Sequence, residues 1–394
     1  MKLIRKLMPV NVYDIAKTQS YLSNMASKGY FFKKLDGFAY FEKGEPEEST
    51  YRLEPLMRNE KMPDEEKLAH YKNYGWEYVC TISTAFHVYR TNKKDYTEIH
   101  TDPIMQSYAF EHLNKNLKFS YLTSILVLPL AAFMTLNSVF LHSHPVLFAV
   151  KYGNVMYKIM ILLMAFFTVK QVISNRKKIN LLLNRLKSGS EMLQESRYEP
   201  NYTPYIFNGL ISLFSIFTIC VSFVMLTTGW EKNLSEYNSS IPTIQLANIE
   251  KAQNFEMEND GYRSNYISYD WTELASAIYE ISERGLVKGQ MWEDQSGKYS
   301  PSLSTEFYQL HFGFLGEALL GDLIDNELEF FRFKPILYQE LLDTNFDKAV
   351  FIQVSETQMF FGRLGKNVIY IRYHGYEDLT AHFEEIYHNV RNFQ

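Results

Sequence analysis

The sequence predicts an α+β membrane protein in which three transmembrane helices join two folded domains. Residues 119–141 and 205–230 are uncharged runs, each long enough to cross a bilayer as a helix. At roughly 100 to 200 residues per domain, a chain of 394 residues can also supply two ordinary domains. Its mean hydropathy of −0.24 is that of a soluble protein, so the membrane-forming residues must be concentrated in short segments.

The first and third spans are predicted from their length alone. Residues 119–141 contain no charged side chain, and Pro129 within them is tolerated in a transmembrane helix. Residues 205–230 are also uncharged and begin directly after Pro204, a residue that favours the first turn of a helix. Both runs therefore have the roughly 20 residues that the hydrocarbon core requires.

The second span, residues 152–173, is predicted from a weaker pattern. The uncharged interior between Lys158 and Lys170 is only 11 residues long. This segment crosses the bilayer if both lysine side chains extend toward opposite interfaces. The alternative is a re-entrant or interfacial helix, which would make the number of crossings even and place both domains on one side.

Charge along the chain predicts the orientation of the spans. Residues 231–394 carry 13 basic and 26 acidic side chains, whereas the preceding part carries 27 basic and 19 acidic ones. The connection at residues 142–156 contains one basic residue, Lys151. The connection at residues 174–204 contains six: Arg176, Lys177, Lys178, Arg185, Lys187 and Arg197. Because such residues are retained in the cytoplasm, we expect a cytoplasmic N-terminus and an extracytoplasmic C-terminal domain in the cell membrane.

Two further features of these segments bear on insertion. The first residues lack the apolar core of a cleavable signal peptide, so we expect the first span to direct insertion. Residues 177–187, within the basic connection, either continue the second helix or lie along the inner leaflet as a basic amphipathic segment. In both cases the lipid bilayer is the expected partner of this region.

Residues 1–110 are predicted to form a cytoplasmic α+β domain in which a β-α-β-β unit occurs twice. Helices are expected at residues 14–28 and 63–74, and each ends at a glycine, Gly29 or Gly75. The expected strands are residues 3–9, 30–34, 38–43, 51–57, 76–82 and 85–90. Duplication of one unit is the simplest interpretation of this order.

Three stretches of this domain resemble a known family. They are YLSNMASKGYFF at residues 21–32, FAYFEKGEPEESTYRLEP at residues 38–55 and YKNYGWEYVCTISTAFHVYRTNK at residues 71–93. They are similar to domain of unknown function 2812 (DUF2812), a family of Gram-positive bacteria. The resemblance covers roughly the first hundred residues and implies membrane helices after the domain and a functional link to a PadR-type regulator. It implies no catalytic residue, because the family has no established activity.

Four aromatic residues of this domain are candidate ligand-binding residues. Tyr40, Trp76, Tyr78 and Phe86 could line a cleft between the two units that holds a small apolar or aromatic molecule. The alternative is that these side chains anchor the core, as aromatic residues in strands commonly do. The cleft hypothesis rests on analogy with other paired modules.

Residues 240–394 are predicted to form a second α+β domain with an antiparallel sheet, after a polar tether at residues 231–245. The first helix is expected from Asp270 to Gly285, because Leu274, Ile278 and Ile281 follow helical spacing. Two more helices are expected at residues 316–331 and 376–390, and strands at residues 307–314, 349–354, 358–364 and 368–373.

No pattern in the chain predicts a catalytic, cofactor or metal site. The candidate metal ligands are Asp322, Asp325, Glu327 and Glu329, and His374, His382 and His388. The acidic group matches no calcium loop and fits the solvated face of an amphipathic helix, and the histidines lack the spacing of a zincin motif. Because Cys80 and Cys220 lie far apart, a disulfide framework is not expected.

The architecture favours a signalling or regulatory function, in which an outer domain that senses or binds acts on an inner domain through the helices. One alternative is a non-catalytic accessory or scaffold subunit with a protein partner in the membrane. Another is an enzyme that acts on envelope material through the outer domain. The sequence contains no phosphate loop, dinucleotide-binding turn or nucleophile elbow, so we expect neither catalysis nor nucleic-acid binding.

Overall fold

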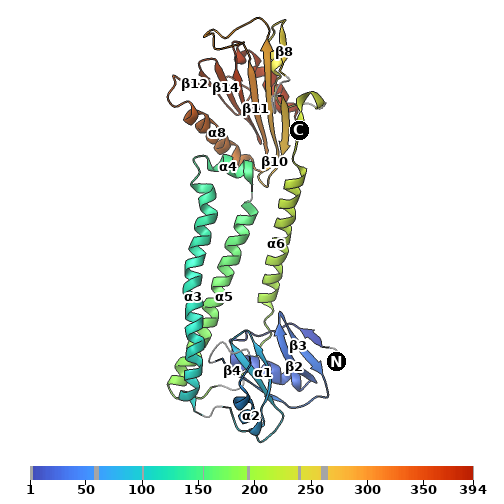
Figure 1. Cartoon of the computed structure of the whole chain (residues 1–394), viewed down its shortest axis with the longest axis vertical. Coiled ribbons are helices and arrows are strands. Elements are labelled where there is room, and N and C mark those ends of the chain that lie inside the picture. The colour runs from blue at the N-terminus through green and yellow to red at the C-terminus, as the bar shows by residue number, and fades with distance from the viewer. Residues whose placement is uncertain are drawn as a thin grey trace. The chain divides into compact units, whose positions relative to one another are not determined.

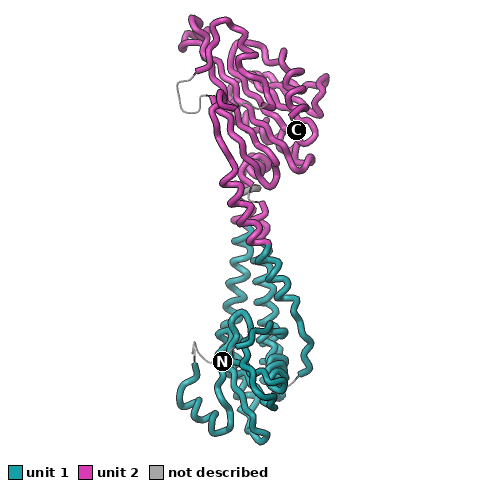
Figure 2. The backbone as a smooth tube through the Cα atoms, turned by 90° about the vertical axis from the view of Figure 1, so that its right-hand side faces the viewer, with its two compact units in different colours: residues 1–132, 161–213 teal, residues 133–160, 214–394 magenta. Residues whose placement is uncertain are grey.

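The chain divides into two compact units (Figure 2). Unit 1 comprises residues 1–132 and 161–213, and unit 2 comprises residues 133–160 and 214–394. A computed structural model describes residues 3–56, 62–99, 102–153, 155–192, 196–237, 241–258 and 265–393. Each unit is built around its own buried hydrophobic clusters.

Three long helices connect the units, α3 (Pro103–Phe140), α5 (Val155–Lys187) and α6 (Thr203–Thr228) (Figure 1). Each is long and apolar enough to cross a membrane. Only 6% of the most apolar stretch of each helix is buried within the protein, as is typical of helices that are surrounded by lipid. Each helix also begins in one unit and ends in the other.

Two of these helices extend beyond the predicted spans. α3 begins well before residue 119, because Phe110, Leu113 and Leu117 on its first turns are buried in the core of unit 1. α5 begins after residue 152 and continues without interruption through residues 177–187. The basic segment therefore continues the second helix, which at 33 residues is roughly 50 Å long, more than a bilayer core requires.

The N-terminal part of unit 1 contains the predicted order of elements twice. The elements are β1 (Ile4–Lys6), α1 (Ile15–Ala26), β2 (Tyr30–Asp36) and β3 (Phe38–Lys43), then β4 (Thr50–Pro55), α2 (Glu65–Asn73), β5 (Glu77–Ile82) and β6 (Phe86–Thr91). The two antiparallel sheets have equivalent strand orders, β1-β3-β2 and β4-β6-β5. Each helix is followed by a glycine with positive φ, Gly29 at +79° and Gly75 at +90°, as predicted.

The core of unit 1 joins both sheets to two of the long helices. Phe32 and Phe41 of the first sheet and Phe86 of the second are buried in one cluster with Phe110 of α3. Ile179, Leu183 and Leu186 of α5 belong to the same cluster. The long helices are therefore part of this domain's core, and burial of their apolar side chains stabilises the helices and the sheets together.

Unit 2 is built on an antiparallel sheet. Its nine described strands are β7 (Trp230–Asn233), β8 (Phe255–Met257), β9 (Tyr266–Asp270), β10 (Ala275–Val287), β11 (Ser302–Leu310), β12 (Leu337–Glu340), β13 (Lys348–Val354), β14 (Thr357–Leu364) and β15 (Asn367–His374). The main path is β12-β13-β14-β15-β11-β10-β9-β7, and β8 pairs with β10. The predicted antiparallel sheet is confirmed.

Helices cover both faces of this sheet. α8 (Gly316–Phe330) packs on the cluster that contains Phe361, and α9 (Phe383–Asn392) packs on the cluster that contains Phe360. Since neighbouring residues of a strand point to opposite faces, the two helices lie on opposite sides of the sheet. The short helix α4 (Pro145–Tyr152) packs on the cluster that contains Phe361, and the short helix α7 (Leu246–Ile249) packs on the cluster that contains Phe360.

The predicted helix at residues 270–285 is wrong, because this segment forms strand β10. Its apolar residues fit helical spacing, but the buried positions from Ile281 to Val287 alternate with more exposed ones. A register shift between Ala275 and Ala277 obscures the alternation at the start of the strand. Pairing with β9 and β11 on its two sides determines the strand, which illustrates how tertiary context overrides local pattern.

Three other expectations for unit 2 need correction. The predicted tether contains β7, which pairs with β9 at the edge of the sheet. The strand expected at residues 307–314 ends at Leu310 because residues from Gly313 turn into α8. α9 begins at Phe383, since Asp378 instead caps a short 3₁₀ helix by accepting a hydrogen bond from Thr380 N.

Candidate functional site

The four aromatic residues predicted to line a cleft are divided between two sheets, with Trp76 directly before β5. Tyr40 is on β3, where Lys34 Nζ lies 4.7 Å from its ring centroid. Trp76 is 1% exposed and packs with Tyr78 in an aromatic cluster, whereas Phe86 belongs to the larger core. Trp76 and Phe86 thus occupy packing positions, and ligand binding by the four residues stays a prediction.

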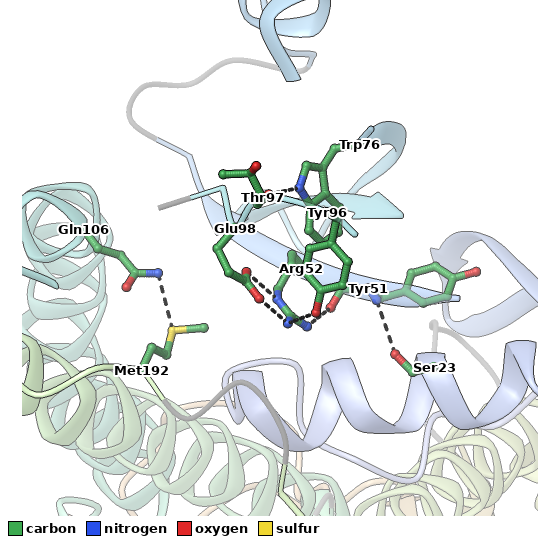
Figure 3. Close-up of polar contacts among 9 residues, drawn as sticks. All are labelled: Ser23, Tyr51, Arg52, Trp76, Tyr96, Thr97, Glu98, Gln106 and Met192. Atoms are coloured by element: carbon green, nitrogen blue, oxygen red, sulfur yellow. Dashed lines mark hydrogen bonds and ion pairs between the residues drawn. The ribbon is translucent and has the colours of Figure 1, made fainter. Parts of the chain in front are cut away.

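A buried arginine organises the segment that leads into α3 (Figure 3). Arg52, on β4, is 6% exposed. Its Nε and Nη2 donate to the two carboxylate oxygens of Glu98 at 3.0 and 2.7 Å, and Nη2 also donates to Tyr96 Oη at 3.2 Å. Nη1 donates to the carbonyl oxygen of Tyr51 at 3.0 Å. This two-pronged, charge-assisted pair fixes residues 96–98 on the second sheet just before the first long helix.

The acidic residues considered as metal ligands either have other partners or are exposed. Glu327 is 8% exposed and lies 3.3 Å from Arg372 Nη1. Glu329 pairs with His144 Nε2 at 3.3 Å, and Asp325 is exposed. Among the residues that the structure describes, no group of three or more His, Cys, Asp or Glu is arranged to hold a metal ion.

Asp322 has a role that the sequence reasoning missed. Its Oδ2 accepts hydrogen bonds from Val146 N at 2.6 Å and Leu147 N at 2.9 Å, the first free amides of α4. The carboxylate therefore caps the N-terminus of α4, where it also interacts favourably with the helix dipole. Because α4 lies in the connection between α3 and α5, this contact joins that connection to α8.

The C-terminal end of α4 is held as firmly as its N-terminal end. Val150 is fully buried, and its carbonyl oxygen accepts a hydrogen bond from Thr272 Oγ1 at 2.8 Å. Lys151 Nζ lies 3.0 Å from carboxylate oxygens of both Glu280 and Glu306. Burial alone would lower the pKa of Lys151, but the two carboxylates outweigh it and raise that pKa. These contacts and those of Asp322 are called the α4 clamp below.

The third long helix is attached to the same sheet without a clamp. α6 ends at Thr228 and β7 begins at Trp230, so one residue separates the helix from the edge strand. Trp271 Nε1 donates to Thr228 Oγ1 at 2.6 Å. Unit 2 therefore contacts, directly or through α4, the ends of α3, α5 and α6 that belong to it.

Unit 1 contacts the other connection, between α5 and α6, in a comparable way. Ser196 N donates to Ser20 Oγ at 3.0 Å, and Tyr198 Oη donates to Asn24 Oδ1 at 3.0 Å. The ring of Tyr198 also lies edge-on to Tyr21, with centroids 5.6 Å apart. Both acceptors are on α1, so the basic connection is part of the N-terminal domain.

Sequence reasoning used Lys151 only as a charge and placed Asp322 on a solvated face. The amide donors that Asp322 caps lie 176 and 175 positions from it in the sequence. The two glutamates that pair with Lys151 lie 129 and 155 positions from that lysine. No local pattern could have paired them. The one available signal was Pro145 at the start of an apolar run, which favours a helix in the connection.

Comparison with known proteins identifies the N-terminal region. A family described as "Protein of unknown function (DUF2812)" matches residues 14–123, from just before α1 into α3. The resemblance to this family is therefore confirmed over that region. No curated protein and no solved structure matches the chain.

Proposed function

We propose that this chain is a signalling or regulatory membrane protein in which unit 2 acts on unit 1 through the three long helices. The α4 clamp carries the proposal, because it ties the α3–α5 connection to the same sheet that continues directly into α6. A change in that sheet would alter the ends of all three helices. Such coupling requires two states with different contacts at the clamp. The proposal assigns no catalytic role.

We place unit 2 outside the cell membrane and the N-terminal domain in the cytoplasm. The basic 174–204 connection favours this orientation by the positive-inside rule. The unit boundaries add support, because the α3–α5 connection groups with the C-terminal domain and the basic connection groups with the N-terminal one. Both groupings are expected if α5 crosses the membrane.

We also propose that the N-terminal domain arose by duplication of one β-α-β-β unit. The equivalent order of strands in the two sheets supports this origin. So does the positive-φ glycine that ends the helix in each half. The two halves share one core with α3 and α5, so a signal carried by these helices would reach both halves.

The test measures transmission from the clamp to the other unit. Phe167 and Phe207 lie in unit 1 on α5 and α6, with ring centroids 4.1 Å apart. Both are replaced by cysteine in a chain without Cys80 and Cys220, and the rate of disulfide formation is measured in membrane vesicles. Asp322→Ala should remove the α4 cap, at a cost of about 1 kcal/mol, and change that rate at least about threefold.

The matched control is Asp325→Ala, which removes an exposed carboxylate from the same helix. It should leave the rate of disulfide formation unchanged. If Asp322→Ala also leaves the rate unchanged while hydrogen exchange shows that α4 has been released, the coupling proposal fails. Equal effects of both substitutions would also contradict it, because they would indicate a general response to lost charge.

A non-catalytic accessory subunit is the second candidate, favoured by exposed apolar side chains that flank an edge strand in the sequence. Phe333 is 85% exposed and Leu342 is 86% exposed, on either side of edge strand β12. Exposed apolar surface beside an edge strand is typical of a protein-binding site. The test is purification of the chain in detergent. A protein partner that co-purifies in stoichiometric amount with the natural chain, but not with Phe333→Glu, would favour this candidate over signalling.

A further inference from the structure

A cavity of about 700 Å³, lined by both polar and apolar side chains, lies in unit 1 among the loop after β1, the middle of α5 and the start of α6. Three hydrogen bonds hold its walls together. Asn11 Nδ2 donates to Asn175 Oδ1 at 2.9 Å, Met8 N donates to Tyr205 Oη at 3.2 Å, and Asn201 N donates to the carbonyl oxygen of Pro9 at 2.8 Å. The cavity has the volume of a small-molecule site and is formed by three separate segments of the chain.

The cavity combines amide side chains with charged ones, and the cavity and the groove next to it together carry one more lysine than carboxylates. Its amides are those of Asn11, Gln171, Asn175, Asn201 and Asn208. Lys17 is paired with Asp14 at 3.4 Å, whereas half-buried Lys178 forms no ion pair within the described part of the chain. Lys170 lines the adjoining groove, so three lysines and the two carboxylates of Asp14 and Glu199 line the cavity and the groove together. Ammonium and amide groups together suit a phosphate and its neighbouring hydroxyls.

An apolar groove continues from this cavity between α5 and α6. It has a volume of about 650 Å³, and its apolar lining comes from Met164, Phe167, Phe207 and Ile211. Several residues, among them Ser174 and Pro204, line both the cavity and the groove. The cavity, with its amide and charged groups, and the apolar groove thus form one continuous surface.

The position of this surface along the helices matches the depth of a lipid molecule. The apolar residues of the groove belong to the predicted spans, residues 152–173 and 205–230. Asn175, Lys178 and Asn201 belong to the basic connection between those spans. The groove therefore lies at the depth of the hydrocarbon core. The cavity lies at the depth of the lipid headgroups on the side of the N-terminal domain.

We propose that the cavity and the groove together bind one anionic phospholipid. Its phosphate lies beside Lys178 and the cavity amides, and one acyl chain follows Phe167 and Phe207 along the groove. In a bilayer the apolar groove cannot be filled favourably by water, whereas an acyl chain buries its surface. Basic pockets between membrane helices are suited to such headgroups. The bound lipid would join the loop after β1 to both helices.

The test is native mass spectrometry of the full chain in micelles that contain equal amounts of dioleoyl phosphatidylglycerol and dioleoyl phosphatidylcholine. We expect one phosphatidylglycerol retained per chain in preference to phosphatidylcholine. Lys178→Gln should weaken that retention about tenfold, as expected for one lost charge-assisted hydrogen bond. Glycerol 3-phosphate and oleate, tested separately, should each bind more weakly than the whole lipid because each fills only one part of the site.

Two further variants make the result specific. Lys177→Gln removes an exposed ammonium at the neighbouring position of α5 and should leave retention unchanged. Ser174→Trp places a large side chain where the cavity meets the groove and should abolish retention. Equal retention of the two lipids, equal effects of Lys177→Gln and Lys178→Gln, or normal retention by Ser174→Trp would each overturn the proposal.

Discussion

Glu283 is a carboxyl group that the fold of unit 2 buries with few partners. It is 1% exposed on β10, and its Oε2 accepts a hydrogen bond from Leu246 N at 3.0 Å. Its Oε1 has no hydrogen-bond partner among the described residues. Burial raises the pKa of Glu283 to about 7, against an opposing effect of the Leu246 amide. The side chain therefore titrates near neutral pH while it holds the segment around α7.

This raised pKa makes the stability of unit 2 depend on pH. The ordinary value is 4.5, so between pH 4.5 and about 7 the folded state retains a proton that the unfolded state loses. Stability should consequently fall as pH rises through this window and then level off. As pH rises from 4.5 to 8, the free energy of unfolding of Glu283→Gln should increase by about 3 kcal/mol relative to that of the natural chain.

Urea unfolding followed by tryptophan fluorescence measures this difference, because Trp230, Trp271 and Trp292 all lie in unit 2. Glu377→Gln, an exposed position in the same unit, should keep the natural pH dependence. A Glu283→Gln chain whose stability falls with pH as steeply as the natural one would show that another group is responsible.

At the scale of elements, Gly285 shows why β10 and β8 can pair. A Cβ at this position would lie 2.0 Å from Phe255 Cε2, which is closer than any real contact. Gly285 faces Met257 in the register of the two strands. The glycine predicted to end a helix is in fact the site where a neighbouring aromatic side chain crosses a strand.

Gly285→Ala should therefore displace Phe255 and weaken the pairing of β8 with β10. We expect a loss of about 1 to 3 kcal/mol, typical of overpacking, and faster hydrogen exchange of the amides at residues 255–257. The double variant with Phe255→Ala should regain protection at these amides. Gly321 lies on α8 with open space around it, so Gly321→Ala should leave hydrogen exchange at residues 255–257 unchanged.

How far each element could be predicted depends on the range of its contacts. In the N-terminal domain, the helix ends at Gly29 and Gly75 and the Asp36-Gly37 hairpin are local signals, and the order of elements follows them. The last three strands of unit 2 are joined by tight turns and were also predictable. β10 was not, because its apolar spacing fits a helix until β9 and β11 are placed beside it.

The candidate site was less predictable than the fold for the same physical reason. Asp322 and Lys151 are common residue types in a helix and in a polar connection, and neither position is unusual in isolation. Their roles arise only when α4 docks between α8 and the sheet. The aromatic residues Trp76 and Phe86 were conspicuous in the sequence, but their burial fits packing as well as it fits function.

At the scale of the whole molecule, the proposed orientation predicts which parts are reachable from outside the cell. Asn326→Cys, exposed on α8, should react with a membrane-impermeant maleimide in intact cells, in a chain without Cys80 and Cys220. Glu48→Cys, exposed in the N-terminal domain, should react only after lysis. An odd number of crossings places these two positions on opposite sides of the membrane.

Two outcomes of this labelling would be decisive against the orientation. Labelling of Glu48→Cys in intact cells with protection of Asn326→Cys would reverse it. Equal protection of both positions would indicate an even number of crossings and would remove α5 from the spans. Lysis in detergent, after which both cysteines should react, is the control for their accessibility.

The proposed action of unit 2 on unit 1 is constrained by the single residue between α6 and β7. Gly229 leaves too little chain for the helix and the edge strand to move separately, and the Trp271–Thr228 hydrogen bond joins them further. In the proposed coupling, rotation of the sheet would be passed directly to α6. α3 and α5 meet the same sheet through α4, the docked helix in the connection between them. The coupling therefore predicts twisting of α6 against α3 and α5 rather than sliding of one helix along its length.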